Sequence, residues 1–524
     1  MNEPERLLTI TELSIARTGD ARLELDRVSL AVDEHETVVI LGEDRSGKDA
    51  LMRALCGARE GEERIGGSIL FGAPDERPRI GSAAVRVVYL PGPSSQPLSP
   101  HASAISQLAR VIARKLNAPH GSGRAEFEQE IAKLDGAPAL VSFEKRAGEL
   151  SPEILAWGLL AAALAQTPDL LLVDHLFEGI APQAARPLEK ALLAAKARLN
   201  CAVVCATMMT ETAVRLGGRL VVLRGGRIVE EGPVVRLATA QAHAYTQTLF
   251  KDVVPRERNP QRGQPVLQAL HVGLRPDHGP RDEINFELRR GASLALVGED
   301  GSGRRDLVRR ILGMERLDKG RIVFDAVDIG ILSPQMMSRL RRRVAIIAGA
   351  DDVLDPRMSL GETVAEPLRA HLHLPGDLVA NYRENALRRV GLASLPGHLP
   401  ISALSNFDRR RLQVARAIVT APVLTIVDEP FRGLDAFAQS VIRDLLQSFR
   451  TEEGPAFLVI TSDFSVARAL ADDAMVFRDG RVVDRGVLAD MLRSPKNAYT
   501  RTLVEASRLD AQPPETLPSA AAGS

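Results

Sequence analysis

The chain has 524 residues, of which 45% are hydrophobic, and its 67 basic and 67 acidic residues cancel. This length and apolar content predict more than one folded domain, and large α/β domains reduce the expected number to two. The charge balance excludes a strong global attraction to nucleic acid or to an anionic membrane surface. Three cysteines (Cys56, Cys201 and Cys205) are too few for a disulfide framework and form no C-x-x-C pair.

The two features that would predict a secreted or membrane-spanning chain are both missing from the sequence. The first residues, MNEPERLLTI, lack the basic start and apolar centre of a secretory signal. The longest apolar stretch, at 154–165, is shorter than the roughly 18–20 residues that cross a bilayer. We therefore expect a soluble chain that reaches a membrane only through a partner.

The first chemical motif follows the apolar run at 38–41 and reads GEDRSGKD. An apolar strand that enters a helix through G-x-x-x-x-G-K-[ST] is typical of a phosphate-binding loop. In such a loop the backbone N–H groups surround phosphates, the lysine reaches the outer phosphates and the hydroxyl binds magnesium. Here the lysine is present, but an aspartate replaces the hydroxyl. The predicted nucleotide-binding residues of this first loop are Gly42, Glu43, Asp44, Arg45, Ser46, Gly47, Lys48 and Asp49.

Further along, the stretch at 95–150 predicts a mainly helical insertion that ends in LSPEI at 150–154. The apolar run at 170–173 then ends in Asp174, which is followed by His175. Strand-like runs here alternate with helical stretches, which predicts a mostly parallel sheet covered by helices.

A second loop, GEDGSGRR, follows the apolar run at 294–297 and has arginines in place of both the lysine and the hydroxyl. A second helical insertion is expected at 350–403, and the sequence IVDEP places Asp428 and Glu429 after another apolar run. The predicted nucleotide-binding residues of this second loop are Gly298, Glu299, Asp300, Gly301, Ser302, Gly303, Arg304 and Arg305.

The two loops belong to an internal repeat. Gly42 and Gly298 are 256 residues apart, and the spacing from Asp174 to Asp428 is 254 residues. The same spacing of 254 separates three further pairs of landmarks, which are Leu150-Ser151 with Leu404-Ser405, Gly226-Arg227 with Gly480-Arg481, and Tyr245-Thr246 with Tyr499-Thr500. A period of this length indicates a duplicated domain rather than a solenoid.

We predict a first domain at 5–254, a linker at 255–265, a second domain at 266–508 and a disordered tail at 509–524. The segment around the linker is charged and carries proline and glycine, which is typical of an exposed connection. The tail reads QPPETLPSAAAGS at its end, a composition that cannot form a packed core. We call 5–254 the first half and 266–508 the second half.

The order of loop, helical insertion, L-S-x-x-x and apolar strand ending in Asp resembles the ATP-binding cassette (ABC) family, twice and over essentially the whole chain. More narrowly, the halves resemble the ATP-binding subunits of oligopeptide, dipeptide and nickel importers. Those subunits carry a G-E-S-G-S-G-K-S loop and an H-P-Y-T-R-x-L stretch near each domain end. The corresponding stretches here are HAYTQTL at 243–249 and NAYTRTL at 497–503.

The resemblance implies an α/β fold of two tandem P-loop nucleotide-binding domains. Each would have a RecA-like, mostly parallel sheet, an antiparallel β subdomain and a helical subdomain. In the family each ATP lies between the loop of one domain and the L-S signature of the other. The implied cofactors are ATP and Mg²⁺, the implied signature contacts to nucleotide are Ser151 and Ser405, and the implied metal ligands are Asp174 and Asp428.

The family positions also imply two unlike and eroded sites. The glutamate that polarises the attacking water is replaced by His175 in the first half, whereas Glu429 keeps it in the second half. We therefore name Glu429 and His175 as the catalytic candidates, with His175 either a substitute base or a residue that only fills space. Asp49 either binds magnesium or repels phosphate, and we favour repulsion. The signature glycines are also replaced, by Pro152 and Glu153 in one half and by Asn406 and Phe407 in the other.

Three functions remain open at this stage. The first is an ATP-binding, energy-coupling subunit of a peptide-type importer, with weak hydrolysis because both sites are eroded. Its partners would be two membrane permease subunits and, indirectly, a solute-binding protein, without nucleic acid. It would be cytoplasmic and peripheral on the inner face of the plasma membrane.

The second possible function is a pseudo-ATPase that serves as a regulatory or scaffold subunit. The third is a soluble tandem protein of translation or repair, against which the short linker and the missing zinc cysteines argue. The halves would pair with each other or with a second ABC chain.

Overall fold

The computed structural model describes residues 6–17, 23–58, 63–72, 85–115, 122–250, 263–274, 283–349, 354–372, 374–451 and 454–507. The chain divides into two compact units, one built mainly from Met1–Lys251 and the other from Asp252–Leu434 and Ala438–Arg508. The predicted tail at 509–524 and most of the predicted linker, 255–262, lie outside the described residues. The predicted domain limits therefore stay a prediction.

A six-stranded sheet in the order β5-β6-β7-β3-β8-β9 forms the centre of the first unit. Its first five strands are parallel and β9 is antiparallel to β8. Every residue of β3 is buried, as expected for a parallel strand covered on both faces. The strands are β3 (Thr37–Leu41), β5 (Val87–Pro91), β6 (Leu170–Asp174), β7 (Ala202–Thr207), β8 (Arg219–Arg224) and β9 (Arg227–Pro233).

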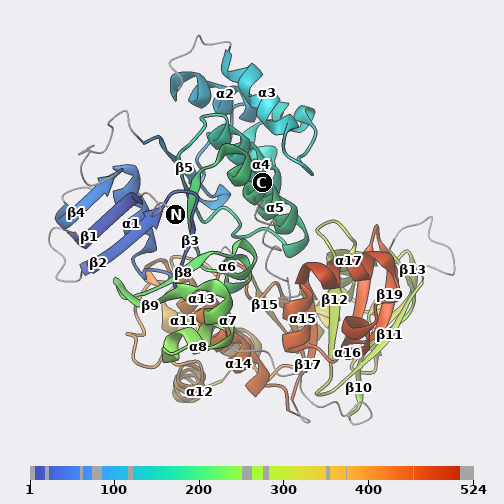
Figure 1. Cartoon of the computed structure of the whole chain (residues 1–524). Helices are drawn as coiled ribbons and strands as arrows, with labels where there is room; N and C mark the ends of the chain where they lie inside the picture. Colours follow the sequence, from blue (N-terminus) through green and yellow to red (C-terminus); the bar gives the residue numbers. More distant parts are fainter. Residues whose placement is uncertain are drawn as a thin grey trace. The chain divides into compact units, whose positions relative to one another are not determined.

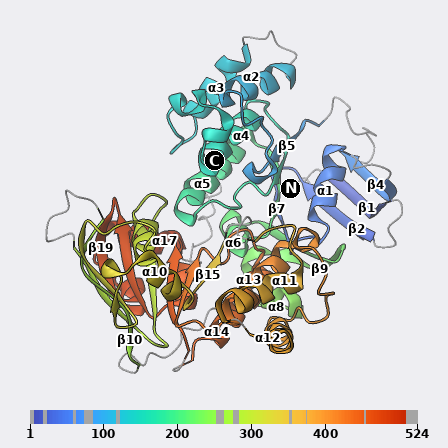
Figure 2. The same ribbon diagram turned by 180° about the vertical axis from the view of Figure 1, so that it is seen from behind.

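A separate antiparallel sheet in the order β2-β1-β4 lies beside helix α1 (Figures 1 and 2). Helices α2 and α3 lie apart from this sheet and pack with α4. The buried Ile105, Leu108 and Ile112 of α2 recur every three or four residues, which makes one apolar face. These strands are β1 (Arg6–Arg17), β2 (Leu23–Asp33) and β4 (Glu63–Phe71).

The helices of the first unit connect the strands and supply the predicted insertion. They are α1 (Lys48–Cys56), α2 (Ala104–Lys115), α3 (Ser122–Ala132), α4 (Pro152–Leu164), α5 (Pro182–Leu199), α6 (Thr210–Leu216), α7 (Val234–Thr239) and α8 (Ala244–Leu249), with short 3₁₀ turns at Pro93–Ser95, Leu140–Glu144 and Ala147–Glu149. The mainly helical character expected for 95–150 is confirmed by α2, α3 and these turns in the described part of that range.

The second unit repeats this plan. Its six-stranded sheet has the order β15-β16-β17-β12-β18-β19, again with only the last strand antiparallel. A smaller antiparallel sheet has the order β11-β10-β13-β14. The strands are β10 (Pro265–Gly273), β11 (Ile284–Arg289), β12 (Ser293–Val297), β13 (Lys319–Phe324), β14 (Val327–Asp328), β15 (Val344–Ala348), β16 (Leu424–Asp428), β17 (Ala456–Thr461), β18 (Asp473–Arg478) and β19 (Arg481–Val487).

The second helical insertion, expected at 350–403, is also present in the described part of that range, as α11, α12 and short helical turns. The helices of this unit are α9 (Arg304–Ile311), α10 (Pro334–Arg341), α11 (Leu360–Pro367), α12 (Gly376–Arg389), α13 (Asn406–Ile418), α14 (Ala436–Ser448), α15 (Phe464–Leu470), α16 (Leu488–Arg493) and α17 (Ala498–Ser507), with short helical turns at Ile329–Ile331, Leu368–Leu372 and Ile401–Ala403. The α/β fold with two parallel-sheet, P-loop-like domains is thus confirmed.

Two hairpins of the same kind position the loops. Gly225 and Gly226 both have positive φ between β8 and β9, and Asp479 and Gly480 do so between β18 and β19, as a tight two-residue hairpin turn requires. The N–H of Gly226 donates to the carbonyl of Ser46 at 2.8 Å, and the N–H of Gly480 donates to that of Ser302 at the same distance. Each hairpin therefore fixes the loop of its own unit.

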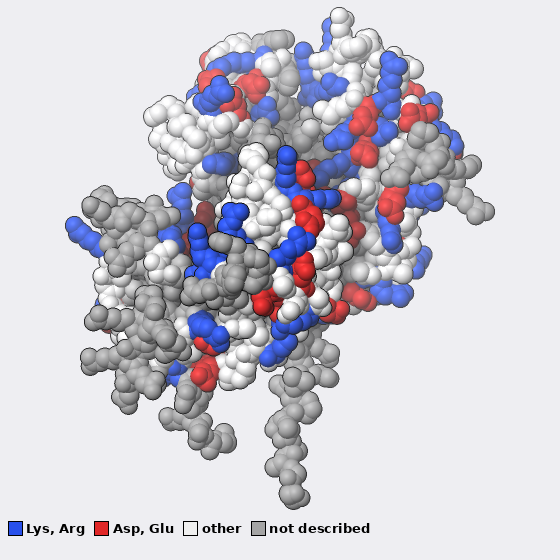
Figure 3. All heavy atoms as spheres, turned by 90° about the horizontal axis from the view of Figure 1, so that it is seen from above, with Lys and Arg blue, Asp and Glu red and all other residues white. Residues whose placement is uncertain are grey.

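The surface carries both signs of charge, as the equal numbers of basic and acidic residues lead one to expect. In the space-filling view of Figure 3, blue basic and red acidic side chains are interspersed over the described residues of the face shown.

Candidate functional site

The first loop joins the end of β3 to the start of α1 and needs its glycines. Gly47 has φ 107°, and a Cβ there would meet the carbonyl oxygen of Glu24 at 2.6 Å. A Cβ on Gly42 would lie 2.4 Å from the carbonyl oxygen of Leu223. Only glycine fits both positions. Helix α1 begins directly after Gly47, and the N-terminus of a helix after such a loop is a general anion-binding position.

Lys48 is the buried cation of this loop. Its side chain is only 2% exposed, and its Nζ donates to the carbonyl oxygen of Glu43 at 2.8 Å and to Ser46 Oγ at 3.4 Å. Both partners are neutral, so the ammonium keeps its charge available inside the loop. A phosphate group bound there would meet this positive charge.

The second loop has the same backbone but different side chains. Gly303 has φ 97°, and a Cβ on Gly298 would lie 2.5 Å from the carbonyl oxygen of Phe477. The side chain of Arg304 is 2% exposed and stands where Lys48 stands in the first unit. The difference between the two sites therefore lies in their side chains.

A tyrosine hydroxyl accepts a hydrogen bond from the backbone of each loop, and the sequence analysis assigned these tyrosines no role. The N–H of Glu43 donates to Tyr245 Oη at 3.1 Å, and the N–H of Glu299 donates to Tyr499 Oη at 3.4 Å. An arginine lies over each ring, Arg224 at 4.6 Å and Arg478 at 5.0 Å from the ring centre. The recurrence of Tyr-Thr at 254 residues was the signal in the sequence that marked both positions.

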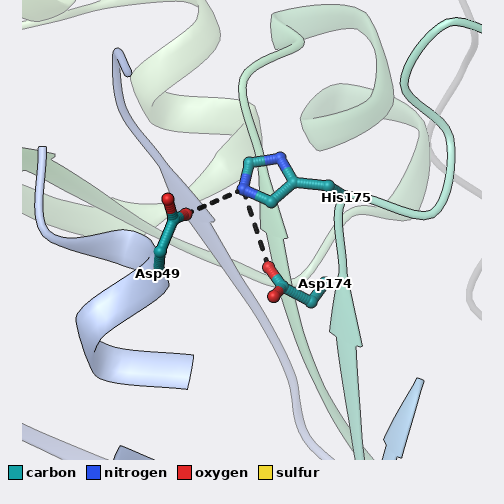
Figure 4. A group of neighbouring side chains, drawn as sticks. All are labelled: Asp49, Asp174 and His175. Atoms are coloured by element: carbon teal, nitrogen blue, oxygen red, sulfur yellow. Dashed lines mark hydrogen bonds and ion pairs between the residues drawn. The ribbon is translucent and has the colours of Figure 1, made fainter. Parts of the chain in front are cut away.

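His175 and its neighbours form the centre of the first site, at the carboxyl end of β6 (Figure 4). His175 Nε2 lies 3.1 Å from Asp49 Oδ1 and 3.6 Å from Asp174 Oδ1. His175 Nδ1 bonds to Glu178 Oε1 on the other side. Tyr89 Oη donates to Asp174 Oδ2 at 2.7 Å. The structure thus brings together the predicted residues Asp49, Asp174 and His175 and adds Glu178, which sequence reasoning missed.

These contacts set the charges of the cluster. Burial by itself lowers the pKa of His175, but hydrogen bonds to Asp49 and Glu178 outweigh it and raise that pKa to about 10. The hydrogen bond from His175 lowers the pKa of Asp49, whereas burial raises the pKa of Asp174. At neutral pH the imidazole is therefore charged, a state that does not suit a general base. The catalytic role of His175 stays a prediction.

In the second unit the corresponding acids are paired with arginines. Arg305 contacts Asp428 through two bonds, Nε to Oδ2 at 3.1 Å and Nη2 to Oδ1 at 3.3 Å. Arg304 Nη2 donates to Glu429 Oε1 at 3.1 Å and to Asp300 Oδ1 at 2.9 Å. Burial raises the pKa of Glu429, and the guanidinium of Arg304 opposes that shift.

His175 and Glu429 share one backbone feature. They occupy the same place after the acidic strand of each unit, and both have left-handed φ, 54° and 46°. The N–H of His175 donates to the carbonyl of Ala206 at 3.1 Å, and that of Glu429 donates to the carbonyl of Ile460 at 2.8 Å. Unfavourable backbone conformations held in this way are common at functional sites.

The two signature serines begin helices in the helical part of each unit. Ser151 precedes α4, whose first turn contains Pro152 and Glu153. Ser405 precedes α13, and its Oγ accepts from the N–H of Asp408 at 3.1 Å. Their proposed contacts with nucleotide stay predictions.

The first site fits the expected cofactors better than the second. Its loop geometry and Lys48 suit phosphate, and Asp174 Oδ1 is buried and accepts no hydrogen bond from the described residues, as a ligand to a cation or its water would. In the second site Arg305 already engages both oxygens of Asp428, and no Mg²⁺ fits beside that guanidinium. The residues present thus fit ATP with Mg²⁺ in the first unit and do not fit Mg²⁺ in the second.

None of the described helices combines the length and the apolar character that crossing a bilayer requires.

Known proteins similar to this chain include ATP-binding proteins of transporters. The ABC transporter family model matches residues 281–432. The chain is 29% identical over 534 residues to the peptidoglycan transport ATP-binding protein YejF of Agrobacterium fabrum, with 96% of each chain covered. It is 26% identical over 558 residues to the glutathione import ATP-binding protein GsiA of Salmonella typhimurium, with 95% of this chain and 89% of the relative covered. Of solved structures, cbiO1 from Clostridium perfringens shows 27% identity and a TM-score of 0.40 over 44% of this chain and 91% of its own.

The two parallel-sheet units each carry a phosphate-type loop and an acidic strand end, and an ABC transporter domain is matched at 281–432, within the second unit. More narrowly, the chain resembles the ATP-binding proteins YejF and GsiA over nearly its full length, as a tandem ABC protein would. The resemblance predicted from the sequence is therefore confirmed.

Proposed function

We propose that this chain is the ATP-binding, energy-coupling subunit of a peptide-type importer, that its first half holds the nucleotide, and that its second half is blocked by its own arginines. The observation that carries the proposal is the contrast between Lys48, whose partners are neutral, and Arg304 and Arg305, which are paired with Glu429 and Asp428.

In the first half Lys48 and the N–H groups of the loop would bind the outer phosphates. Mg²⁺, when bound, would neutralise the phosphate charge, and Asp174 would hold it through water. Asp49 stands in place of the hydroxyl ligand and adds negative charge near the phosphates. ATP binding therefore persists in this half but is weaker than with a hydroxyl at that position.

Hydrolysis is proposed to be weak in both halves. A lost general base lowers the rate by roughly 10²–10⁴, and a lost electrostatic donor by about 10²–10³. The first half lacks the glutamate, and the second half has Arg304 in place of the lysine. Because the groups of one site act as a unit, these losses do not add simply, but each acts directly on phosphoryl transfer.

The proposed partners follow from the relatives. Two membrane permease subunits would bind the chain, a solute-binding protein would act through them, and the chain would be peripheral on the inner face of the membrane. The two halves would pair with each other or with a second ABC chain. The names of the relatives mention peptidoglycan transport and glutathione import, and we propose a solute of one of these classes for this chain.

A pseudo-ATPase acting as a regulatory or scaffold subunit is the second candidate. It is favoured by one observation, the buried Arg304–Glu429 pair, because this pair ties the second loop to the end of β16 without nucleotide. In that case the fold would serve assembly rather than turnover.

The test is the stoichiometry of Mg-ATP binding to the purified chain by calorimetry. We expect one site per chain, abolished by Lys48→Ala and unaffected by Arg304→Ala. The double variant Arg304→Lys with Arg305→Ser removes the competing guanidinium of Arg305 and restores the lysine and hydroxyl, so it should gain a second site. Two sites in the unaltered chain would contradict the blocked second half. No binding at millimolar ATP would leave the scaffold function.

A further inference from the structure

The carboxylates of Asp49 and Asp174 and the imidazole of His175 converge on one point in the first unit. One ligand atom from each lies within 4.8 Å of the others. Figure 4 shows Asp49 on α1 and the other two at the end of β6, with Nε2 of the ring turned toward both carboxylates. We propose that these three side chains bind a divalent transition-metal cation directly, in the absence of nucleotide.

The ligand types select the kind of cation. One imidazole with two carboxylates suits Zn²⁺, Mn²⁺, Fe²⁺, Co²⁺ or Ni²⁺, whereas Mg²⁺ prefers oxygen ligands alone. Three protein ligands also leave open positions for water or a small anion. This site is therefore distinct in chemistry from the Mg²⁺ that accompanies ATP.

The spacing of the ligand atoms fits such a cation. With metal–ligand bonds of about 2.0 Å, the ligands of a tetrahedral site lie about 3.3 Å apart. The distances from His175 Nε2 are 3.1 Å to Asp49 Oδ1 and 3.6 Å to Asp174 Oδ1, one just below and one just above that value.

Glu178 orients the imidazole for this role. It accepts a hydrogen bond from His175 Nδ1, so that nitrogen keeps its proton, and a bound cation would displace the proton of the charged imidazole from Nε2. Glu178 is itself held by the N–H of Met208 at 2.9 Å. A carboxylate behind a histidine ligand is the usual arrangement in metal sites, because it fixes the ring and raises its basicity.

Asp174 supplies an independent indication. Its Oδ2 accepts from Tyr89 Oη at 2.7 Å, but its Oδ1 is buried and accepts no hydrogen bond from the described residues. A buried acceptor without a partner is costly. A cation between Asp174 and His175 would satisfy this oxygen.

The second unit has different residues at the positions of the proposed metal ligands and therefore serves as an internal control. The positions of Asp49, Asp174 and His175 are there taken by Arg305, Asp428 and Glu429, and the guanidinium of Arg305 engages both oxygens of Asp428. The proposed cation would thus bind in the first unit alone. It would link α1 to the end of β6, a role that does not depend on ATP.

The test is a titration of the full-length, nucleotide-free chain with Co²⁺ after treatment with chelator, followed by the visible absorption of bound Co²⁺. We expect one Co²⁺ per chain. His175→Ala and Asp49→Asn should each weaken binding at least tenfold. Glu178→Gln should weaken it about 10- to 100-fold, because only the orienting bond is altered. Glu429→Gln is the matched control in the second unit and should leave stoichiometry and affinity unchanged.

Circular dichroism in chelator establishes that each variant is folded before it is titrated. Absence of Co²⁺ binding by the folded, unaltered chain would overturn the proposal, and so would binding that persists unchanged in both His175→Ala and Asp49→Asn. Because no nucleotide is present, either result is independent of the Mg-ATP titration that tests the proposed function.

Discussion

The two loops have nearly the same backbone, yet they balance charge in opposite ways. In the first unit three acids, Asp49, Asp174 and Glu178, surround a single histidine. In the second unit Arg304 and Arg305 surround Asp428 and Glu429. Lys48 of the first loop has neutral hydrogen-bond partners, whereas Arg304 and Arg305 of the second loop are paired with acids of their own unit. The acidic cluster of the first unit can still attract a cation. In the second unit both Asp428 and Glu429 are already paired with arginines.

Breaking the buried pair of the second unit should have the largest effect. Glu429→Ala removes one of the two carboxylate partners of the fully buried Arg304 and leaves only the exposed Asp300. Breaking a buried ion pair costs up to about 3–5 kcal/mol of folding free energy. We expect the unfolding transition of this unit in urea to move to clearly lower denaturant. The control is the double variant Arg304→Met with Glu429→Gln, which removes both charges and should recover most of the loss. A single variant as stable as the parent would show that the pair does not hold the loop.

Changing Asp49 should increase the difference in Mg-ATP binding between the two units by strengthening the first site. Asp49→Ser removes a carboxylate near the phosphates, an interaction of about 1 kcal/mol in water and more in a partly buried site. It also restores a hydroxyl for magnesium. We expect Mg-ATP affinity of the first half to rise about tenfold by calorimetry. Arg305→Ser alone, at the matching position of the second unit, should create no site because Arg304 remains. Weaker binding by Asp49→Ser would mean that this carboxylate itself holds the magnesium.

Removing the hydroxyl of the tyrosine that contacts each loop should change ATP affinity by a smaller amount, and in the first half only. Tyr245→Phe deletes the hydrogen bond to the N–H of Glu43, which is worth about 0.5–1.5 kcal/mol. We expect a several-fold loss of ATP affinity. Tyr499→Phe deletes the equivalent bond to Glu299 and should leave ATP binding unchanged. Equal effects of the two variants would indicate that both halves bind nucleotide.

The smallest expected effect is a pH dependence of the first cluster. The pKa of His175 is raised to about 10, above the unfolded value of about 6.5. Its charge therefore stabilises the fold fully below pH about 6.5, and this contribution is lost as the pH rises through about 10. In chelator, the melting temperature of His175→Gln should lie below that of the parent at pH 6 and approach it near pH 10. A gap that widens with pH would contradict the assigned charge.

Much of the fold could be read from the sequence because its signals are local. The runs at 38–41 and 294–297 and the glycines after them predict a strand, a loop and a helix, and the structure has β3 and β12 followed by α1 and α9. The repeat of about 254 residues predicted that one plan occurs twice, and both six-stranded sheets follow the same order of strands. The helical insertions were likewise predicted.

The partners of the site residues could not be predicted in this way. Sequence reasoning treated Asp49 as a charge facing phosphate, yet the structure pairs it with His175, 126 residues away. Glu178 and Tyr89 had no motif that marked them, although both contact the cluster. Arg304 and Arg305 were recognised as losses, but their bonds to Glu429 and Asp428 span 125 and 123 residues.

The sequence by itself thus determined the duplicated α/β plan and the family resemblance, and it predicted the positions at which the two loops differ from that family, because periodicity and loop chemistry depend on neighbouring residues. Only the tertiary structure decided which side chains neutralise one another. That outcome depends on where the ends of β6 and β16 bring their acids relative to α1 and α9, and on how deeply the side chains are buried there. Burial sets the strength of each charge, and it is a property of the packed chain.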